Sequence, residues 1–253
     1  MRSVSTKACP CCLPGHRRSA DRRLAACLRL AALIAVFAVG GMVHVSAQPA
    51  VDPGINAPYQ NPDVEYWRGV FETERREIYR YRYEILDALG LEPGMEVADI
   101  GTGTGFFALL FADAVGPEGH VHAVDISPTF VSAIRERAAT SGFANLTGVV
   151  NEPRDVRLAP SSIDLAFISD TYHHFEYPRE ILRSIREALR PGGTLVIVDF
   201  RRIPGISSGW VMSHVRAGAD VVLKEVSSAG FALVERRDFM PTQYYMRFRK
   251  VDG

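Results

Sequence analysis

The sequence predicts an α/β fold in which helices cover a mostly parallel β-sheet. Short apolar runs alternate with amphipathic segments from residue 91 onwards, as expected where helices join parallel strands. One run, V-A-D-I at 97–100, leads into the glycine-rich turn G-T-G-T-G at 101–105 and then into an apolar helical segment. A strand, a glycine turn and a helix in this order form a loop for a nucleotide-type ligand, because glycine lets the backbone approach closely.

The expected elements follow the chain in order. Apolar residues recur at spacings of three and four over residues 63–89, which predicts an amphipathic helix or a pair of helices before the first strand. Five strands are expected, the first ending at Asp99, the second ending at Asp125, and the others at 146–150, 163–168 and 195–200. Helices at 107–115, 128–142 and 178–189 lie between strands of this set.

The end of the chain departs from this alternation. A helix around residues 210–229 precedes two further strands, 231–237 and 243–249. The gap between these two strands is too short for a helix, so they are predicted to form an antiparallel hairpin at the edge of the sheet.

Charge divides the chain into a basic front and an acidic body. Residues 1–47 hold seven of the 29 Lys and Arg residues and one of the 29 acidic residues, so the remainder has a formal charge of −6. An acidic body argues against a nucleic-acid partner, because phosphate binding needs clustered Lys and Arg. No nucleic-acid partner is therefore expected.

The front has the parts of an export signal. An arginine-rich start is followed by an apolar run at 30–43 and by small residues before Gln48. We expect export to the periplasm or cell exterior after cleavage near Ala47. The alternative is a membrane anchor formed by residues 30–43, which would associate the protein with a membrane. All four cysteines lie in this leader, and no metal site is assigned to them.

Four regions are expected along the chain. The leader covers residues 1–47, and a linker rich in Pro, Asn and Ala without periodicity covers 48–62. A helical cap at 63–90 precedes the main domain at 91–253.

The pattern acid-x-G-x-G-x-G at 99–105 resembles the first motif of the class I S-adenosylmethionine-dependent methyltransferases. A dinucleotide fingerprint, G-x-G-x-x-G, would need its third glycine where Phe106 stands, which disfavours an NAD-linked oxidoreductase. Twenty residues past Gly105, the second strand ends in Asp125, where an acid suits the hydroxyls of a ribose.

This resemblance implies a Rossmann-like seven-stranded sheet of order 3-2-1-4-5-7-6 and S-adenosylmethionine as the cofactor. Asp99 would face the methionyl ammonium group, Asp125 would hold the ribose, and Glu152 would lie by the adenine amino group or, equally, be a solvent-exposed turn residue. The implied cofactor-binding residues are Asp99, Gly101, Thr102, Gly103, Gly105, Asp125, Ile126, Glu152 and Asp170.

The segment D-T-Y-H-H-F at 170–175 bears on the reaction type. Relatives that methylate amide or base nitrogens commonly carry an N-P-P-Y-like sequence here, and this chain does not. Methyl transfer needs an aligned nucleophile and a proton acceptor, and histidine titrates near neutrality. His173 and His174 are therefore the candidate general bases. Adjacent loop residues usually point apart, so only one of them is expected to reach the pocket.

Three further residues are expected to contact the substrate. Tyr172 and Phe175 are placed to face the positive sulfur with their rings, and His214 on the tail helix is placed to join the histidine pair. Three histidines are able to bind a metal, but their spacing does not require one, so no metal is assigned.

The segment 181–200, which contains L-R-P-G-G-T-L-V-I-V-D-F, is similar to the quinone-biosynthesis C-methyltransferases. The expected function is methyl transfer from S-adenosylmethionine to a small-molecule or lipid-like acceptor at oxygen or carbon. The alternative is a non-catalytic cofactor-binding protein of the same fold, because export would separate the chain from its cytosolic cofactor.

Overall fold

The computed structural model describes residues 50–251. The leader, its cysteines, the expected cleavage site at Ala47 and the expected anchor at 30–43 lie outside the described residues. Within 50–251, no helix combines the length and the apolar character needed to cross a bilayer.

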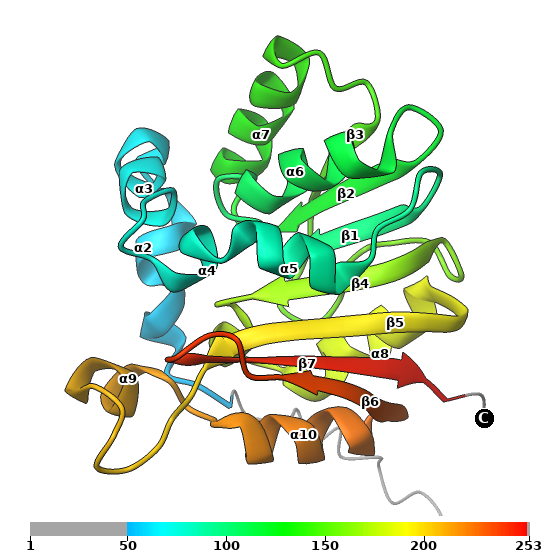
Figure 1. Cartoon of the computed structure of the whole chain (residues 1–253). Helices are drawn as coiled ribbons and strands as arrows, with labels where there is room; N and C mark the ends of the chain where they lie inside the picture. The colour runs from blue at the N-terminus through cyan, green and yellow to red at the C-terminus, as the bar shows by residue number, and fades with distance from the viewer. Residues whose placement is uncertain (1–49, 252–253) are drawn as a thin grey trace, which may run out of the picture. The chain divides into compact units, whose positions relative to one another are not determined.

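Seven strands form one mixed sheet in the order β3-β2-β1-β4-β5-β7-β6 (Figure 1), which confirms the expected order. The first five strands along this order are parallel, and β7 pairs antiparallel with both β5 and β6. Their bounds are β1 Glu96–Ile100, β2 His120–Asp125, β3 Leu146–Val150, β4 Ile163–Ser169, β5 Leu189–Phe200, β6 Phe231–Arg237 and β7 Gln243–Lys250.

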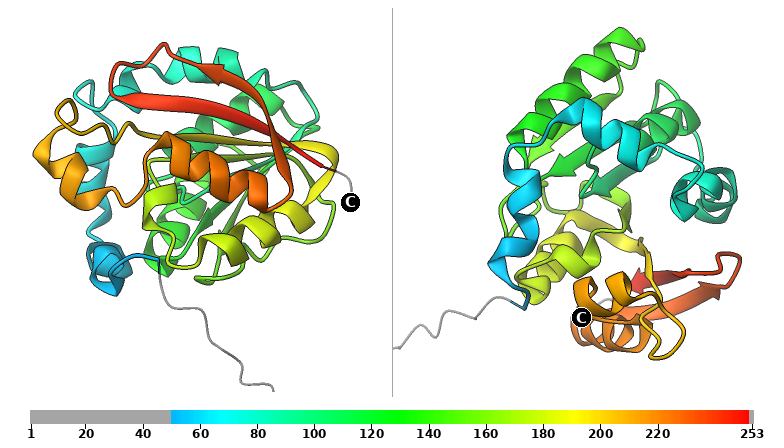
Figure 2. Two further views of the ribbon diagram at one scale, coloured as in Figure 1. Left: turned by 90° about the horizontal axis from the view of Figure 1, so that it is seen from below. Right: turned by 90° about the vertical axis from the view of Figure 1, so that its left-hand side faces the viewer.

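Helices cover both faces of the sheet (Figures 1 and 2). The helices α5 (Arg82–Leu89), α6 (Phe106–Val115) and α7 (Pro128–Thr140) cover one face, and α8 (Pro178–Ala188) and α10 (Ala219–Ser228) cover the other. In β5, Leu195 and Ile197 face α8, while Val196 and Val198 face the opposite core. Because such strands are buried on both faces, they read as continuous apolar runs, and each large side chain contributes about 1.5–3 kcal/mol by burial.

The segment before β1 is more ordered than the expected linker and cap. Residues Pro53–Asn56 form the 3-10 helix η1 and Ala57–Gln60 form α2, followed by α3 (Val64–Phe71) and α4 (Glu77–Arg80). The Asp52 carboxylate accepts the Gly54 N–H and caps η1. The helix or pair of helices expected at 63–89 is instead three helices, α3, α4 and α5. The break at 72–76 brings Glu72 and Arg76 against the main domain.

The expected helix at 210–229 is also divided, into α9 (Gly209–His214) and α10. The connecting residues are not helical, and Val215 and Ala217 are both buried, two positions apart. This spacing of two is typical of extended backbone and not of a helix. Strand β5 begins at Leu189, earlier than the expected 195, because the P-G-G segment continues the strand.

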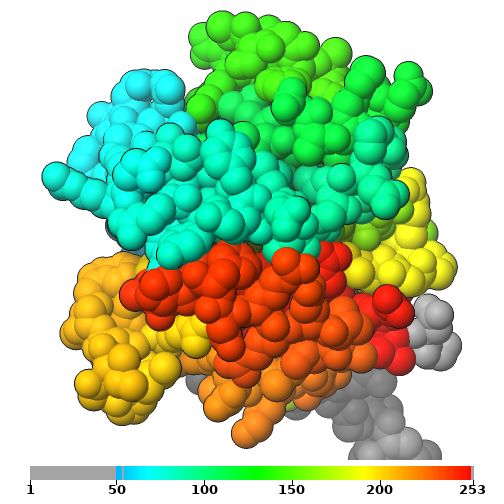
Figure 3. Space-filling view, in the orientation of Figure 1, coloured from blue at the N-terminus to red at the C-terminus, as the bar shows by residue number. Residues whose placement is uncertain are grey.

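Helices α2, α3 and α9 lie at the edge of the sheet where β1, β2 and β4 end (Figure 2, right). On a neighbouring face, α5 packs directly against the C-terminal hairpin (Figure 3). There the Tyr245 hydroxyl and the Arg247 guanidinium both donate to the carbonyl oxygen of Ala88. The last of the N-terminal helices, α5, is therefore held against the hairpin.

Candidate active site

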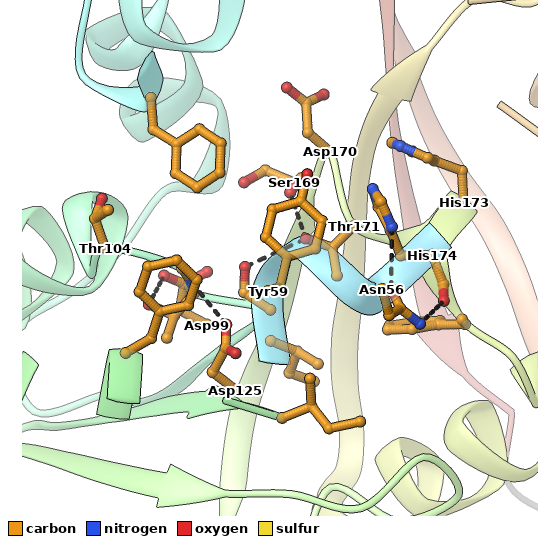
Figure 4. Close-up of a pocket in the computed structure, with 18 of the residues that line it drawn as sticks. Asn56, Tyr59, Asp99, Thr104, Asp125, Ser169, Asp170, Thr171, His173 and His174 are labelled. Atoms are coloured by element: carbon orange, nitrogen blue, oxygen red, sulfur yellow. Dashed lines mark hydrogen bonds between the residues drawn. The ribbon is translucent and has the colours of Figure 1, made fainter. Parts of the chain in front are cut away.

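A cavity of about 430 Å³ opens at the carboxyl ends of the parallel strands, between the glycine loop and helices α2, α3 and α9. This is the position at which open α/β sheets bind ligands, and the volume is typical of small-molecule sites. Figure 4 shows Asp99 and Asp125 on one side of the cavity, His173 and His174 on the other, and Tyr59 between them.

The glycine loop has the geometry of a cofactor cradle. Gly101, Gly103 and Gly105 all have positive φ angles, of +72°, +56° and +79°. A Cβ atom on Gly101 would lie 2.1 Å from the Thr171 side chain, and one on Gly103 would lie 3.2 Å from the Phe71 ring. Glycine is required here because larger residues would be strained and would fill the cavity floor.

Two buried carboxylates flank this loop. Asp125 accepts the N–H groups of Gly103 and Ser127, at 2.9 and 2.8 Å, one on each oxygen. Asp99 accepts the Thr102 hydroxyl at 2.6 Å. Thr102 itself lines the cavity, and its hydroxyl orients the Asp99 carboxylate.

Burial raises the pKa of Asp99 to about 7 and the pKa of Asp125 to about 6. Within residues 50–251 neither carboxylate forms an ion pair. Buried acids without a cation suit a ligand that brings its own positive charge and hydroxyl donors. The ammonium group and ribose diol of S-adenosylmethionine meet this requirement, so the residues present fit the cofactor.

Two other predicted cofactor residues, Ile126 and Glu152, line the same cavity. Ile126 is 39% exposed, and Glu152 is exposed and forms an ion pair with Arg157. Their roles beside the adenine stay predictions.

Asp170 has different partners from those expected. It lines the cavity, but its two carboxylate oxygens are bonded to the Arg76 guanidinium and to the Gln243 side-chain amide. Its contacts therefore anchor the 72–76 segment to the sheet instead of leaving the carboxylate free for a cofactor.

A second anchor holds α3 over the glycine loop. Arg137 on α7 donates to both oxygens of Glu72, at 2.6 and 2.9 Å, and the Thr104 hydroxyl donates to the same carboxylate at 2.9 Å. Phe71 at the end of α3 then covers Gly103. Together α3 and the 72–76 segment form a lid on the cofactor side of the cavity.

Three histidines gather on the opposite side. His173 and His174 lie in the 3-10 helix η2 (Tyr172–His174), and His214 is the last residue of α9. The ring centroids of His173 and His174 are 4.3 Å apart, and that of His214 lies 5.3 and 5.1 Å from them. The expectation that His214 joins the pair is thus matched by the geometry.

The Asp199 carboxylate fixes His173. It accepts the backbone N–H at 3.1 Å and the ring Nδ1 at 2.8 Å, and both side chains are buried. Because a carboxylate only accepts hydrogen bonds, Nδ1 is assigned the proton. Burial lowers the pKa of His173, but the charge and hydrogen bond of Asp199, together with the charge of Asp170, outweigh burial, so the net pKa is raised.

His174 has the opposite electrostatic environment. Burial and the neighbouring rings of His173 and His214 lower its pKa to about 3. Its Nδ1 lies 3.1 Å from Asn56 Oδ1, while Asn56 Nδ2 donates to the His174 carbonyl oxygen. His174 is therefore neutral over the physiological pH range.

Two expectations about η2 were wrong. Both His173 and His174 line the cavity, because Asp199 and Asn56 hold their rings from different elements. Tyr172 does not line it. This residue is fully buried in the core between the sheet and helices α8 and α10, and its hydroxyl donates to Glu225 at 2.7 Å. Phe175 lines the cavity and packs against Tyr172.

Sequence reasoning missed several residues of the site. Asp199 stands at a strand tip like Asp99 and Asp125, so the same signal was present in V-I-V-D. Asn56 and Tyr59 lie in the aperiodic segment expected to be a linker and carry no local signal. Other aromatic side chains that line the cavity are Trp67, Phe71, Phe106, Phe107, Phe130, Phe200 and Trp210.

The fold and the cavity together define a Rossmann-like protein with a methyl-donor site. The chain matches the methyltransferase domain family over residues 91–237 and belongs to this family. The expected superfamily and its cofactor, S-adenosylmethionine, are thereby confirmed.

The individual relatives match only part of this chain. The chain is similar to an arsenite methyltransferase of Halobacterium salinarum, with 31% identity over 43% of this chain and 28% of that protein. It is also similar to the ubiquinone/menaquinone biosynthesis C-methyltransferase UbiE of Ectopseudomonas mendocina, with 31% identity over 47% of each chain. The chain thus spans less than half the length of these two relatives.

Among solved structures, a SAM-dependent methyltransferase from Aquifex aeolicus shares the fold with a TM-score of 0.67. The two are 22% identical, and the match covers 76% of this chain and all of the other.

Proposed function

We propose that this chain transfers a methyl group from S-adenosylmethionine to a small-molecule or lipid-like acceptor at an oxygen or carbon atom. The observation that carries the proposal is a single cavity that joins the glycine loop and two buried carboxylates to the histidine cluster. The first half offers partners for the cofactor, and the second half offers ring nitrogens for the acceptor.

When bound, the cofactor supplies an electrophilic methyl group on a positive sulfur. The residues of the chain must then align the acceptor and take up its proton. His173 suits this role better than His174, because Asp199 orients the ring and stabilises its protonated form. A histidine with a pKa of about 3 accepts protons poorly at neutral pH, so His174 serves better as an acceptor contact.

The wall of the cavity favours an apolar, ring-containing acceptor. Tyr59, Trp67, Phe200 and Trp210 line it, and aromatic rings pack well against flat apolar molecules. All four cysteines of the chain lie in the leader, so residues 50–251 offer no thiolate to hold arsenite. This supports a quinol or phenol acceptor, in keeping with the similarity to a C-methyltransferase that is named for ubiquinone/menaquinone biosynthesis.

The test is an acceptor screen on the full chain with isotope-labelled S-adenosylmethionine. Quinols, phenols, hydroxylated lipids and arsenite form the panel, and we expect label to appear in a quinol or phenol. Donor binding without transfer to any oxygen or carbon acceptor would favour the non-catalytic alternative.

A further inference from the structure

We propose that His173, His174 and His214 bind a divalent transition-metal ion, of which zinc is the best match. One ring nitrogen from each residue lies within 4.8 Å of the others. Tetrahedral zinc with nitrogen ligands needs separations of roughly 3.4 Å, which small side-chain rotations provide. Metal binding would therefore require the side chains to rotate slightly, while the backbone stays in place.

The hydrogen bonds of His173 and His174 leave one nitrogen of each ring free to bind a metal. Nδ1 of His173 donates to Asp199, and Nδ1 of His174 donates to Asn56 Oδ1, whose orientation is set because Asn56 Nδ2 donates to the His174 carbonyl. Each proton on Nδ1 leaves a lone pair on Nε2. Within residues 50–251 neither Nε2 atom has a hydrogen-bond partner.

This arrangement matches the surroundings of metal-bound histidine. A ligating ring usually donates its other N–H to a carboxylate or carbonyl, which fixes the ring and strengthens the ligand. Asp199 is such a carboxylate and is only 1% exposed. Asn56 supplies the equivalent carbonyl for His174.

The third ligand comes from α9. His214 ends this helix, and its ring stacks on Trp210 with centroids 4.6 Å apart. Neutral imidazoles without a thiolate favour zinc, copper, nickel or iron over calcium or magnesium. Three protein ligands leave the fourth tetrahedral position open, as in catalytic zinc sites.

The open fourth position of the metal would face the same cavity, so the acceptor could bind to the ion there. This use of the ion rests on the proposed function. A hydroxyl oxygen of the acceptor bound there would lose its proton to solvent more readily, because the metal lowers its pKa. With metal bound, His173 would act as a ligand, and the ion would replace it in activating the acceptor. Metal binding itself does not depend on the proposed function.

The experiment is a titration of the full, tag-free chain with Co²⁺, read by visible absorption, with Zn²⁺ added in competition. Side chains of residues 1–47 that could compete for the ion are replaced in every sample by C9S, C11S, C12S, C27S, H16A and H44A. We expect one equivalent of Co²⁺ with a tetrahedral spectrum, displaced by Zn²⁺. H173A, H174A and H214A should each abolish this spectrum, and N56A should weaken affinity about 10-fold, in line with lost outer-shell support.

The matched control is H122A, which removes a histidine from the other close pair, His120 and His122 on β2. It should leave the spectrum unchanged. Binding of S-adenosylhomocysteine by each variant shows that the fold and the cofactor half are intact. The proposal is overturned if the parent chain binds no Co²⁺ while it still binds S-adenosylhomocysteine, or if the histidine variants bind Co²⁺ like the parent.

Discussion

Asp199 at the end of β5 holds His173 by both its backbone N–H and its ring Nδ1. This contact joins the strand next to the C-terminal hairpin to the loop after β4, and it turns a loop histidine into a fixed element of the cavity wall. Asp199 therefore fixes the histidine side of the cavity, whereas Asp99 and Asp125 lie beside the glycine loop.

Replacing His173 or His174 should slow methyl transfer and spare cofactor affinity. Loss of a general base or of acceptor activation reduces rates by about 10²–10⁴-fold. We expect H173A and H174A to lower kcat by this order while Kd for S-adenosylhomocysteine stays within about twofold. If both variants turn over like the parent, the proposed role of this pair in the reaction is wrong.

Replacing Asp125 should weaken cofactor binding. Hydrogen bonds to a charged group contribute about 1.5–3 kcal/mol each, so loss of one such bond corresponds to about 10- to 150-fold in Kd. D125A should show this loss in calorimetry with S-adenosylhomocysteine. Asp113, exposed on α6 and not part of the cavity wall, provides the control D113A, for which Kd should not change.

Cofactor affinity should fall as the pH falls from 8 to 5.5. The pKa of Asp99 is raised to about 7 and that of Asp125 to about 6, so both carboxylates become neutral within this window and lose their attraction for the cofactor. Each group changes Kd by up to about tenfold per pH unit below its pKa. D99N should remove the part of the dependence that begins near pH 7.

The stability of the cofactor-free protein should respond to these groups in the opposite direction. Their folded-state pKa values lie above the unfolded value of 3.8, so the folded state binds protons more tightly and this contribution to stability grows as the pH falls from 7 towards 4. The effect on stability is measured from the melting temperatures of the parent and of D99N across this range, without cofactor. The effect on affinity is measured by the binding assay. Equal pH profiles for parent and D99N in both assays would contradict the assignment.

Breaking the pair between Glu72 and Arg137 should loosen the lid. Their side chains are 14% and 27% exposed, so the bidentate contact is partly buried and is worth more than a surface pair. E72Q should increase hydrogen exchange over α3 and weaken S-adenosylhomocysteine binding about 3- to 30-fold, since the lid must then be ordered on binding.

The control lies on the same helix. Glu65 pairs with Arg68 on the exposed surface of α3, where an ion pair contributes about 0–1 kcal/mol. E65Q should leave exchange and affinity unchanged. An E72Q protein that exchanges like E65Q would show that the lid is held by other contacts.

The fold was predictable because its signals are local. Alternating apolar runs, the glycine turn and the short gap between β6 and β7 all lie within a few residues, and the resemblance to a known family supplied the strand order. The divided helix at 209–228 was missed because Val215 and Ala217 follow a period of two for only three residues, which is too short to stand out from a helical pattern.

The site was predictable where chemistry coincides with a strand tip. Asp99 and Asp125 were found in this way, and Asp199 would have been found by the same rule. The role of Asn56 in the site could not be predicted, because it depends on a contact with His174, 118 residues further along the chain. The orientation of the two adjacent histidines likewise depends on contacts with β5 and η1, which the pattern of residues 170–175 does not indicate.

The central claim is that the glycine loop and its two carboxylates bind the methyl donor. Calorimetric titration of the full chain with S-adenosylmethionine and with its demethylated product tests this most directly. We expect both compounds to bind at one site per chain and to compete with each other. If neither compound binds to the folded protein, the account of this cavity as a methyl-donor site is contradicted.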